Sequence, residues 1–79
     1  MREQTVSKLN EVVRSVLELP ASADVTAARQ AVTPGWDSLA HAVLIGAMES
    51  EFGLQIDASD SLDLTSYEAI AHFLEARGL

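Results

Sequence analysis

TPGWDSLAHAVLIGAM, residues 33–48, joins a predicted turn directly to the most apolar run of the chain. The Pro-Gly pair at 34–35 is a turn signal. Asp37 is a residue type that caps a helix by accepting a hydrogen bond from an open N–H of the first turn. We therefore expect a helix that begins at Ser38, and with Asp37 as its cap the Ser38 hydroxyl would stay free.

This helix should run to about Phe52, with Gly53 as its left-handed stop. At about 100° per residue, the expected core side holds His41, Leu44, Ile45, Met48 and Phe52. The opposite side, which we call the uncharged face, holds Leu39, Val43, Gly46 and Ser50. A helix packed on one side usually turns charged residues to water. The uncharged face therefore indicates a docking surface, or else a helix that is buried on several sides.

Two further helices are predicted from apolar spacings of three and four. The first runs from about Glu3 to Glu18, ends before Pro20, and turns inward Val6, Leu9, Val13, Val16 and Leu17. The long segment up to Trp36 has room for a short helical turn at 26–30. The last helix follows a capping-box spacing from Thr65 to Glu68, stops at Gly78, and turns inward Tyr67, Ile70, Ala71 and Leu74.

The connector after Gly53 is expected to supply Ile56, Leu62 and Leu64 to the core and to hold one helical turn. The chain has 79 residues, 48% of them hydrophobic, and no cysteine, so its stability must come from apolar packing. One tryptophan, one tyrosine and two phenylalanines leave a core of aliphatic residues, which suits packed helices. The prediction is one all-α domain, residues 1–79, built as a small bundle of three main helices plus one short helix.

The charge balance is strongly acidic, with five basic and twelve acidic residues and a net charge of −7. Such a domain would be repelled by nucleic-acid phosphates and by anionic membranes, so we expect neither as a partner. Basic protein surfaces are the natural partners. No apolar run is long enough for a signal peptide or a membrane span, and a cytoplasmic location is expected.

Few side chains could perform catalysis. His41 follows Ser38 by three residues on one side of a helix, so a Ser–His dyad is one interpretation, but no third partner or oxyanion hole is evident. No His/Asp/Glu group has metal-ligand spacing, and the segment with Asp60 and Asp63 lacks the glycine and glutamate of a calcium loop. The sequence indicates neither an enzyme nor a metal site.

Ser38 itself has two interpretations. It is an ordinary residue of a helix start, or it carries a group, since the positive end of the helix dipole and its open N–H groups would stabilise a phosphate ester there. Trp36 has two as well: its indole contacts a carried group or a partner, where Trp serves as an anchor, or it pins the long loop to the core.

The residues GWDSL, Gly35 to Leu39, resemble the signature of the acyl carrier protein family, Asp-Ser-Leu at the start of the second of four helices. The resemblance covers essentially the whole chain. It implies that Ser38 receives 4′-phosphopantetheine from coenzyme A, whose thiol holds an acyl cargo as a thioester. It also implies that Asp37 and Leu39 contact the phosphopantetheinyl transferase. Partner-facing positions would be Val43, Gly46 and Glu49, with Trp36 as a further candidate, and the interior would be lined by Leu44, Ile45, Met48, Phe52, Ile56, Leu64 and Ile70.

Two departures from the family pattern shape the expected function. Residues 33–35 are Thr-Pro-Gly where fatty-acid carriers usually have Asp-Leu-Gly, and Ala40 and Val43 stand where acidic residues are usual. We therefore expect a stand-alone, monomeric carrier for a specialised pathway, such as polyketide or other secondary-metabolite biosynthesis. Its partners would be the transferase, an acyl-loading ligase or transferase, and downstream biosynthetic enzymes. The alternatives are a carrier of an aminoacyl or small hydroxy-acid unit, or an unmodified helical interaction module.

Overall fold

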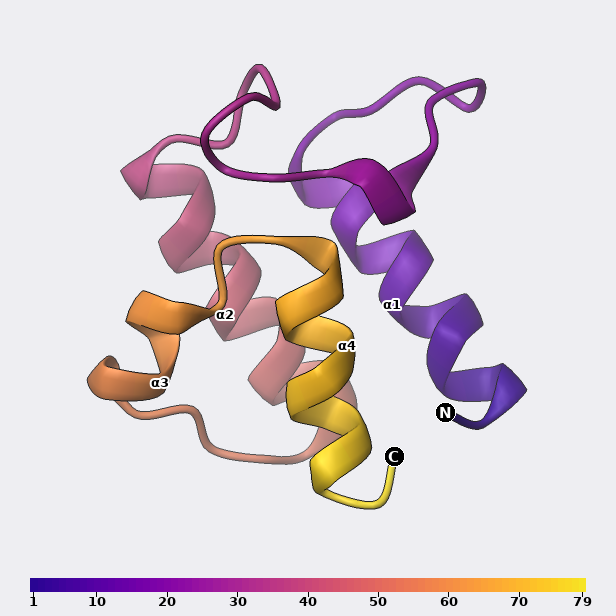
Figure 1. Cartoon of the computed structure of the whole chain (residues 1–79), viewed down its shortest axis with the longest axis vertical. Coiled ribbons are helices and arrows are strands. Elements are labelled where there is room, and N and C mark those ends of the chain that lie inside the picture. The colour runs from indigo at the N-terminus through magenta and orange to yellow at the C-terminus, as the bar shows by residue number, and fades with distance from the viewer.

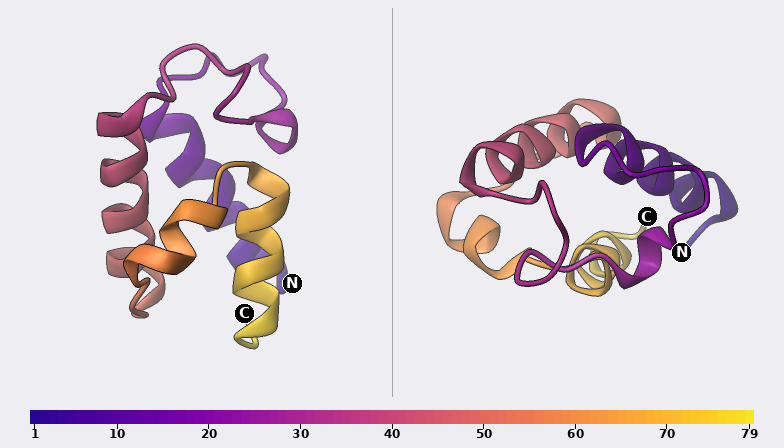
Figure 2. Two further views of the ribbon diagram at one scale, coloured as in Figure 1. Left: turned by 60° about the vertical axis from the view of Figure 1, so that its left-hand side comes forward. Right: turned by 90° about the horizontal axis from the view of Figure 1, so that it is seen from above.

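The computed structural model describes residues 1–79, and its regular structure is entirely helical. In chain order the elements are α1 (Glu3–Val16), the 3₁₀ turn η1 (Val25–Ala27), α2 (Ser38–Phe52), α3 (Ala58–Asp63) and α4 (Tyr67–Ala76). The helices stand around a common centre, and the long loop between α1 and α2 crosses one end of the bundle (Figures 1 and 2). The predicted all-α fold of three main helices and one short helix is confirmed.

The core is a single cluster of buried hydrophobic residues from every part of the chain except α3. Its fully buried members come from the three long helices and are Leu9, Val13, Leu44, Met48, Ile70 and Leu74. Val12 of α1 is also buried, although the expected α1 stripe did not include it. On α2, Leu44, Ile45 and Met48 are buried as predicted, whereas His41 and Phe52 are only partly covered. None of the helices is long and apolar enough to span a membrane.

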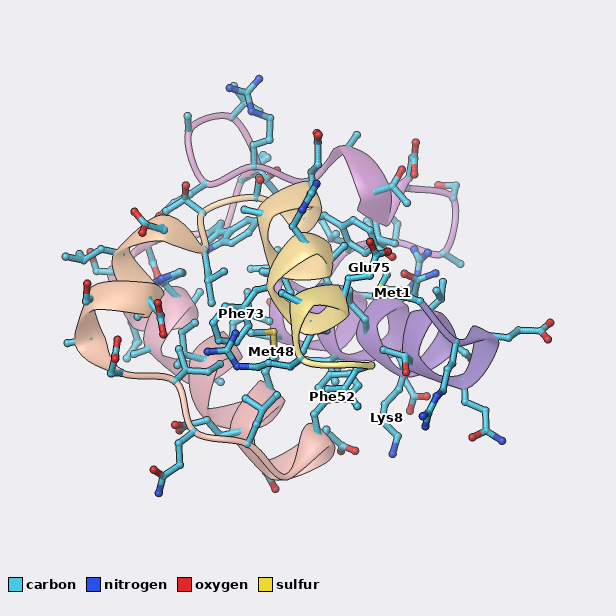
Figure 3. The ribbon with its side chains drawn as sticks, turned by 60° about the horizontal axis from the view of Figure 1, so that its bottom comes forward. Met1, Lys8, Met48, Phe52, Phe73 and Glu75 are labelled. Carbon is cyan, nitrogen blue, oxygen red and sulfur yellow. The ribbon has the colours of Figure 1, made fainter.

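Exposed charged side chains lie at the end of the bundle away from the loop, where they pair between neighbouring helices (Figure 3). The Lys8 ammonium of α1 lies 3.9 Å from the Glu51 carboxylate of α2. The guanidinium of Arg77 lies 3.5 Å from the centre of the Phe73 ring and 3.7 Å from the Asp60 carboxylate. Exposed pairs of this kind contribute little to stability, so the apolar core holds this end together.

The loop between α1 and α2 is ordered by contacts at several points. Helix α1 ends at Val16, two residues earlier than expected, and the Arg14 guanidinium donates to the carbonyls of Pro20 and Ala23. The predicted helical turn is present as η1, which begins one residue and ends three residues earlier than expected. Its cap is Asp24, to which the Thr26 hydroxyl and N–H both donate, and these hydrogen bonds lower the pKa of that carboxyl.

The middle of the loop is fixed to the start of α4. The N–H of Gln30 donates to the carbonyl of Thr65, and the N–H of Tyr67 donates to the carbonyl of Ala28, each over 2.9 Å. Ala28 is buried beside these bonds. The loop is therefore held by the buried side chain of Ala28 and by backbone hydrogen bonds to the start of α4. These contacts fix the position from which the chain enters α2.

Two expectations for the second half of the chain are wrong. Leu62 is 78% exposed, because the six-residue α3 buries none of its side chains and leaves burial to Ile56 and Leu64 on either side. The capping box at Thr65 is not formed. Helix α4 begins one residue later than expected, so that Ser66 is the cap and accepts the Ala69 N–H at 3.0 Å.

Candidate functional site

The start of α2 is built by a turn and a side-chain cap. Gly35 has φ of 86°, a left-handed conformation that favours glycine. Asp37 is extended, and its carboxylate accepts the N–H of Ala40 at 2.8 Å. The predicted cap is confirmed, as is the left-handed stop at Gly53. The turn at Gly35 and the side-chain cap at Asp37 therefore fix where α2 begins.

Ser38 occupies that first helical position and is exposed. Its hydroxyl forms no hydrogen bond within the protein, and neither its own N–H nor that of Leu39 has a backbone or side-chain acceptor. A phosphodiester on this oxygen would face two open donors at the positive end of the helix. Since Asp37 does the capping, a group on Ser38 would displace no existing hydrogen bond. The residues present thus fit a phosphate-linked prosthetic group.

Trp36 lies inside the protein. It is 3% exposed, and its indole N–H donates to Nδ1 of His41 at 3.1 Å. Of the two interpretations of Trp36, the core one is correct, and its assignment as a partner-facing residue is wrong. The reason is that the turn before α2 folds the ring inward, where it anchors the end of the loop.

His41 is engaged at both ring nitrogens. Nδ1 accepts from Trp36, and Nε2 lies 2.8 Å from the carbonyl oxygen of Ser61 and 3.3 Å from its hydroxyl. No bond to Ser38 is formed, so the structure contains no Ser–His dyad. The network from Trp36 through His41 to Ser61 was not foreseen; the only sequence signal was a histidine placed beside an apolar stripe.

The uncharged face is open to solvent along α2. Leu39 is 75% exposed and Val43 53% exposed. Gly46 is exposed too, and a Cβ built there would meet nothing within 4 Å, so packing does not demand glycine. Of the alternatives for this face, burial on several sides is therefore wrong.

Glu49 lies at the edge of that face and not on it. The side chain is partly buried, and one carboxylate oxygen accepts the N–H of Ile56 at 2.9 Å. It therefore stabilises the connector between α2 and α3, which differs from the partner-facing role expected for it. No group of three or more acidic or histidine side chains is placed to hold a metal ion.

Comparisons with known proteins agree with this geometry. Residues 7–74 match the family model described as a phosphopantetheine attachment site. The chain is 28% identical to acyl carrier protein 4, chloroplastic, of Arabidopsis thaliana over 74 residues, which are 94% of this chain and 54% of that protein. It is 30% identical to acyl carrier protein, chloroplastic, of Brassica napus, over 94% of this chain and 55% of that protein. It is 28% identical to acyl carrier protein 1, chloroplastic, of Spinacia oleracea, over 95% of this chain and 54% of that protein.

The chain spans slightly more than half the length of these relatives. No solved structure matches it. The group that phosphopantetheine attachment domains carry is covalent 4′-phosphopantetheine, and such domains are carriers that catalyse no reaction themselves. The family match covers most of the residues described above, including the whole of α2. The chain is a member of the acyl carrier protein family.

Proposed function

We propose that Ser38 is the attachment residue for 4′-phosphopantetheine and that the chain presents an acyl-type intermediate to partner enzymes in a specialised biosynthetic pathway. The observation that carries this proposal is the exposed, unbonded hydroxyl of Ser38 at the first position of α2, next to a neighbour that already caps the helix. No other exposed serine of the chain has this position on a long helix.

The residues around Ser38 have separable tasks. Asp37 fixes the first turn of α2, which keeps the serine oxygen in one place. The open N–H groups of Ser38 and Leu39 would stabilise the charge of a phosphate on that oxygen. The bound group supplies a thiol that holds the cargo as a thioester. The protein supplies position and recognition, so that delivery depends on docking at high local concentration.

The uncharged face is the proposed docking surface for the partners. Leu39 and Asp37 flank the serine and would contact the phosphopantetheinyl transferase, while Val43 and Gly46 would meet the acyl-loading enzyme and downstream enzymes. Because no side chain on this face is charged, apolar contact must replace part of the electrostatic attraction. This feature supports a dedicated partner and hence a specialised pathway.

The chain is proposed to act as a monomer. A cytoplasmic location stays a prediction from the sequence, whereas the relatives named above are chloroplastic by name. The cargo is proposed to be an acyl-type unit. The alternative cargo is an aminoacyl or small hydroxy-acid unit, which the same thioester chemistry would hold.

Loading tests the attachment residue directly. The purified chain is incubated with coenzyme A, magnesium and a phosphopantetheinyl transferase of broad specificity, and its intact mass is measured. Wild type and Ser7→Ala, an exposed serine of α1, should each gain one phosphopantetheine, and Ser38→Ala should gain none. A wild-type chain that no transferase modifies, or a Ser38→Ala chain that is still modified, would overturn the proposal; the first result would favour an unmodified interaction module.

A further inference from the structure

His41 stands where three segments meet. The residue lies in the first turns of α2. Its ring accepts a hydrogen bond from Trp36 of the loop and contacts Ser61 of α3. The Trp36 and His41 rings are inclined by 26°, with centroids 6.1 Å apart. The two partners of this bond bracket Ser38 in the chain, one two residues before it and the other three residues after it.

The hydrogen bonds fix the tautomer of the imidazole. An indole N–H can only donate, so Nδ1 of His41 must accept and can carry no proton. The proton therefore lies on Nε2, which donates to the carbonyl oxygen of Ser61 at 2.8 Å. The neutral ring satisfies both neighbours. In the imidazolium both nitrogens carry hydrogen, and Nδ1–H would meet the indole N–H, donor against donor.

Helix α3 depends on this contact more than a longer helix would. None of its six residues is buried, and its other side-chain link to the bundle is the exposed pair of Asp60 with Arg77. The bond from His41 to Ser61 is partly buried, which makes it the better shielded of the two. One imidazole thus joins the loop end, the attachment serine's helix and α3.

The charged groups on the adjoining segments are engaged elsewhere or form no ion pair with the ring. Asp37 accepts from Ala40, and Glu49 accepts from Ile56. In and beside α3, Asp57 caps the helix and Asp60 pairs with Arg77, while Asp63 is exposed. No carboxylate forms a salt bridge with His41, so none of them directly stabilises an imidazolium.

We propose that His41 is a positioning residue for loading at Ser38: its neutral ring ties Trp36 and α3 to the start of α2, and protonation at Nδ1 breaks the bond from Trp36 while Nε2 keeps donating to Ser61. The loading part of this inference rests on the proposed function; the proton-dependent contact does not. Trp36 is the sole tryptophan, so its fluorescence reports the contact without any label.

The first test follows Trp36 emission and its quenching by acrylamide as the pH is lowered from about pH 8 to about pH 5. Wild type and His72→Asn, which removes the exposed histidine of α4, should show one red shift with increased quenching as the pH falls. His41→Asn, which can still accept from the indole but gains no proton, should show no transition. A flat wild-type curve, or a transition that persists in His41→Asn, would overturn the proposal.

The second test is the rate of phosphopantetheine transfer near neutral pH. His41→Phe keeps a ring but forms neither hydrogen bond, and kcat/KM for loading should fall by at least about fivefold, the effect of losing one net hydrogen bond. His41→Asn should recover most of that loss. Equal loading of wild type and a folded His41→Phe would overturn the positioning role. A wild type that cannot be loaded defeats the proposed function instead, and the fluorescence titration, which uses the unaltered chain, still decides the contact.

Discussion

The carboxylate of Asp37 and the N–H of Ala40 are joined over 2.8 Å, and this bond spans the exposed Ser38. Removing it should cost about 1 kcal/mol of folding free energy, because a helix N–H loses its only acceptor. We expect Asp37→Ala to lower the free energy of unfolding by that amount in a denaturant titration. Asp37→Asn should retain most of the stability, since an amide oxygen also caps. An Asp37→Ala chain as stable as wild type would contradict the geometry of the cap.

Val43 should matter for docking and not for folding. It is 53% exposed on the uncharged face, so Val43→Glu should change the free energy of unfolding by less than about 0.5 kcal/mol. The same change should weaken binding to the cognate partner enzyme, measured by calorimetry, because it places a charge against an apolar surface. Ser7→Glu on α1 adds the same charge elsewhere and should leave binding unchanged. Strong unfolding of Val43→Glu would show that the face is core.

The salt dependence of docking follows from the same face. Attraction between exposed charges is screened as ionic strength rises, whereas contact between apolar surfaces is not weakened by salt. Because the uncharged face lacks ionised side chains, the affinity of the wild-type chain for its partner should change little between low and moderate salt. A steep loss of affinity with salt would instead locate the contact on the acidic residues beside that face.

The helix that bears the site could be predicted from sequence because strong local signals mark both of its ends. Asp37 and Gly53 act through the backbone next to them. Between them apolar residues lie on every side of the helix, and only the spacing of the large residues Leu44, Ile45 and Met48 indicates the buried side. The same spacing put Leu39 and Val43 opposite the core, but the sequence left open whether that side is exposed or buried, and the structure shows that both residues are exposed. What sequence could not give was the path of the loop. Whether Trp36 points inward depends on the backbone bonds from Gln30 and Tyr67 to distant residues, and no local pattern encodes them.

Short elements were predicted less well for a related reason. A six-residue helix has fewer than two turns, so its apolar residues do not define a phase, and Leu62 was assigned to the wrong side. The start of α4 was placed one residue early because Thr65 and Ser66 are both good caps, and only the tertiary structure selects between them. The carbonyl of Thr65 pairs with Gln30, which leaves Ser66 as the cap.

The two leucines at the end of α3 provide a direct test of that distinction. Leu64 is 3% exposed and Leu62 is 78% exposed. Truncating a buried leucine loses its transfer free energy and leaves a cavity, so Leu64→Ala should cost about 2–4 kcal/mol of folding free energy. Leu62→Ala should cost less than about 0.5 kcal/mol. Thermal and denaturant unfolding of the two variants measures both losses of folding free energy. A larger loss for Leu62→Ala than for Leu64→Ala would mean that α3 is rotated about its axis.

Tyr67 should ionise late. Its ring is buried at the start of α4, and its hydroxyl donates to the Asn10 side chain of α1. Burial raises the pKa of this phenol above its ordinary value, and the negative charge of Asp24 raises it further. Ultraviolet absorbance of the phenolate, from the sole tyrosine of the chain, should therefore titrate above about pH 10, and Asp24→Asn should bring the midpoint down.

The same shift has a consequence for stability. Folded Tyr67 holds its proton more tightly than the unfolded chain does, so its contribution to the free energy of unfolding is complete below the unfolded pKa and is lost as the pH rises through the folded one. Alkaline unfolding should begin in that range. Asp63→Asn, which removes an exposed carboxylate that is not among the causes of the shift, should leave the phenol midpoint where it is. A midpoint at or below the ordinary tyrosine value would mean that Tyr67 is open to water and that α4 does not pack on α1 through this bond.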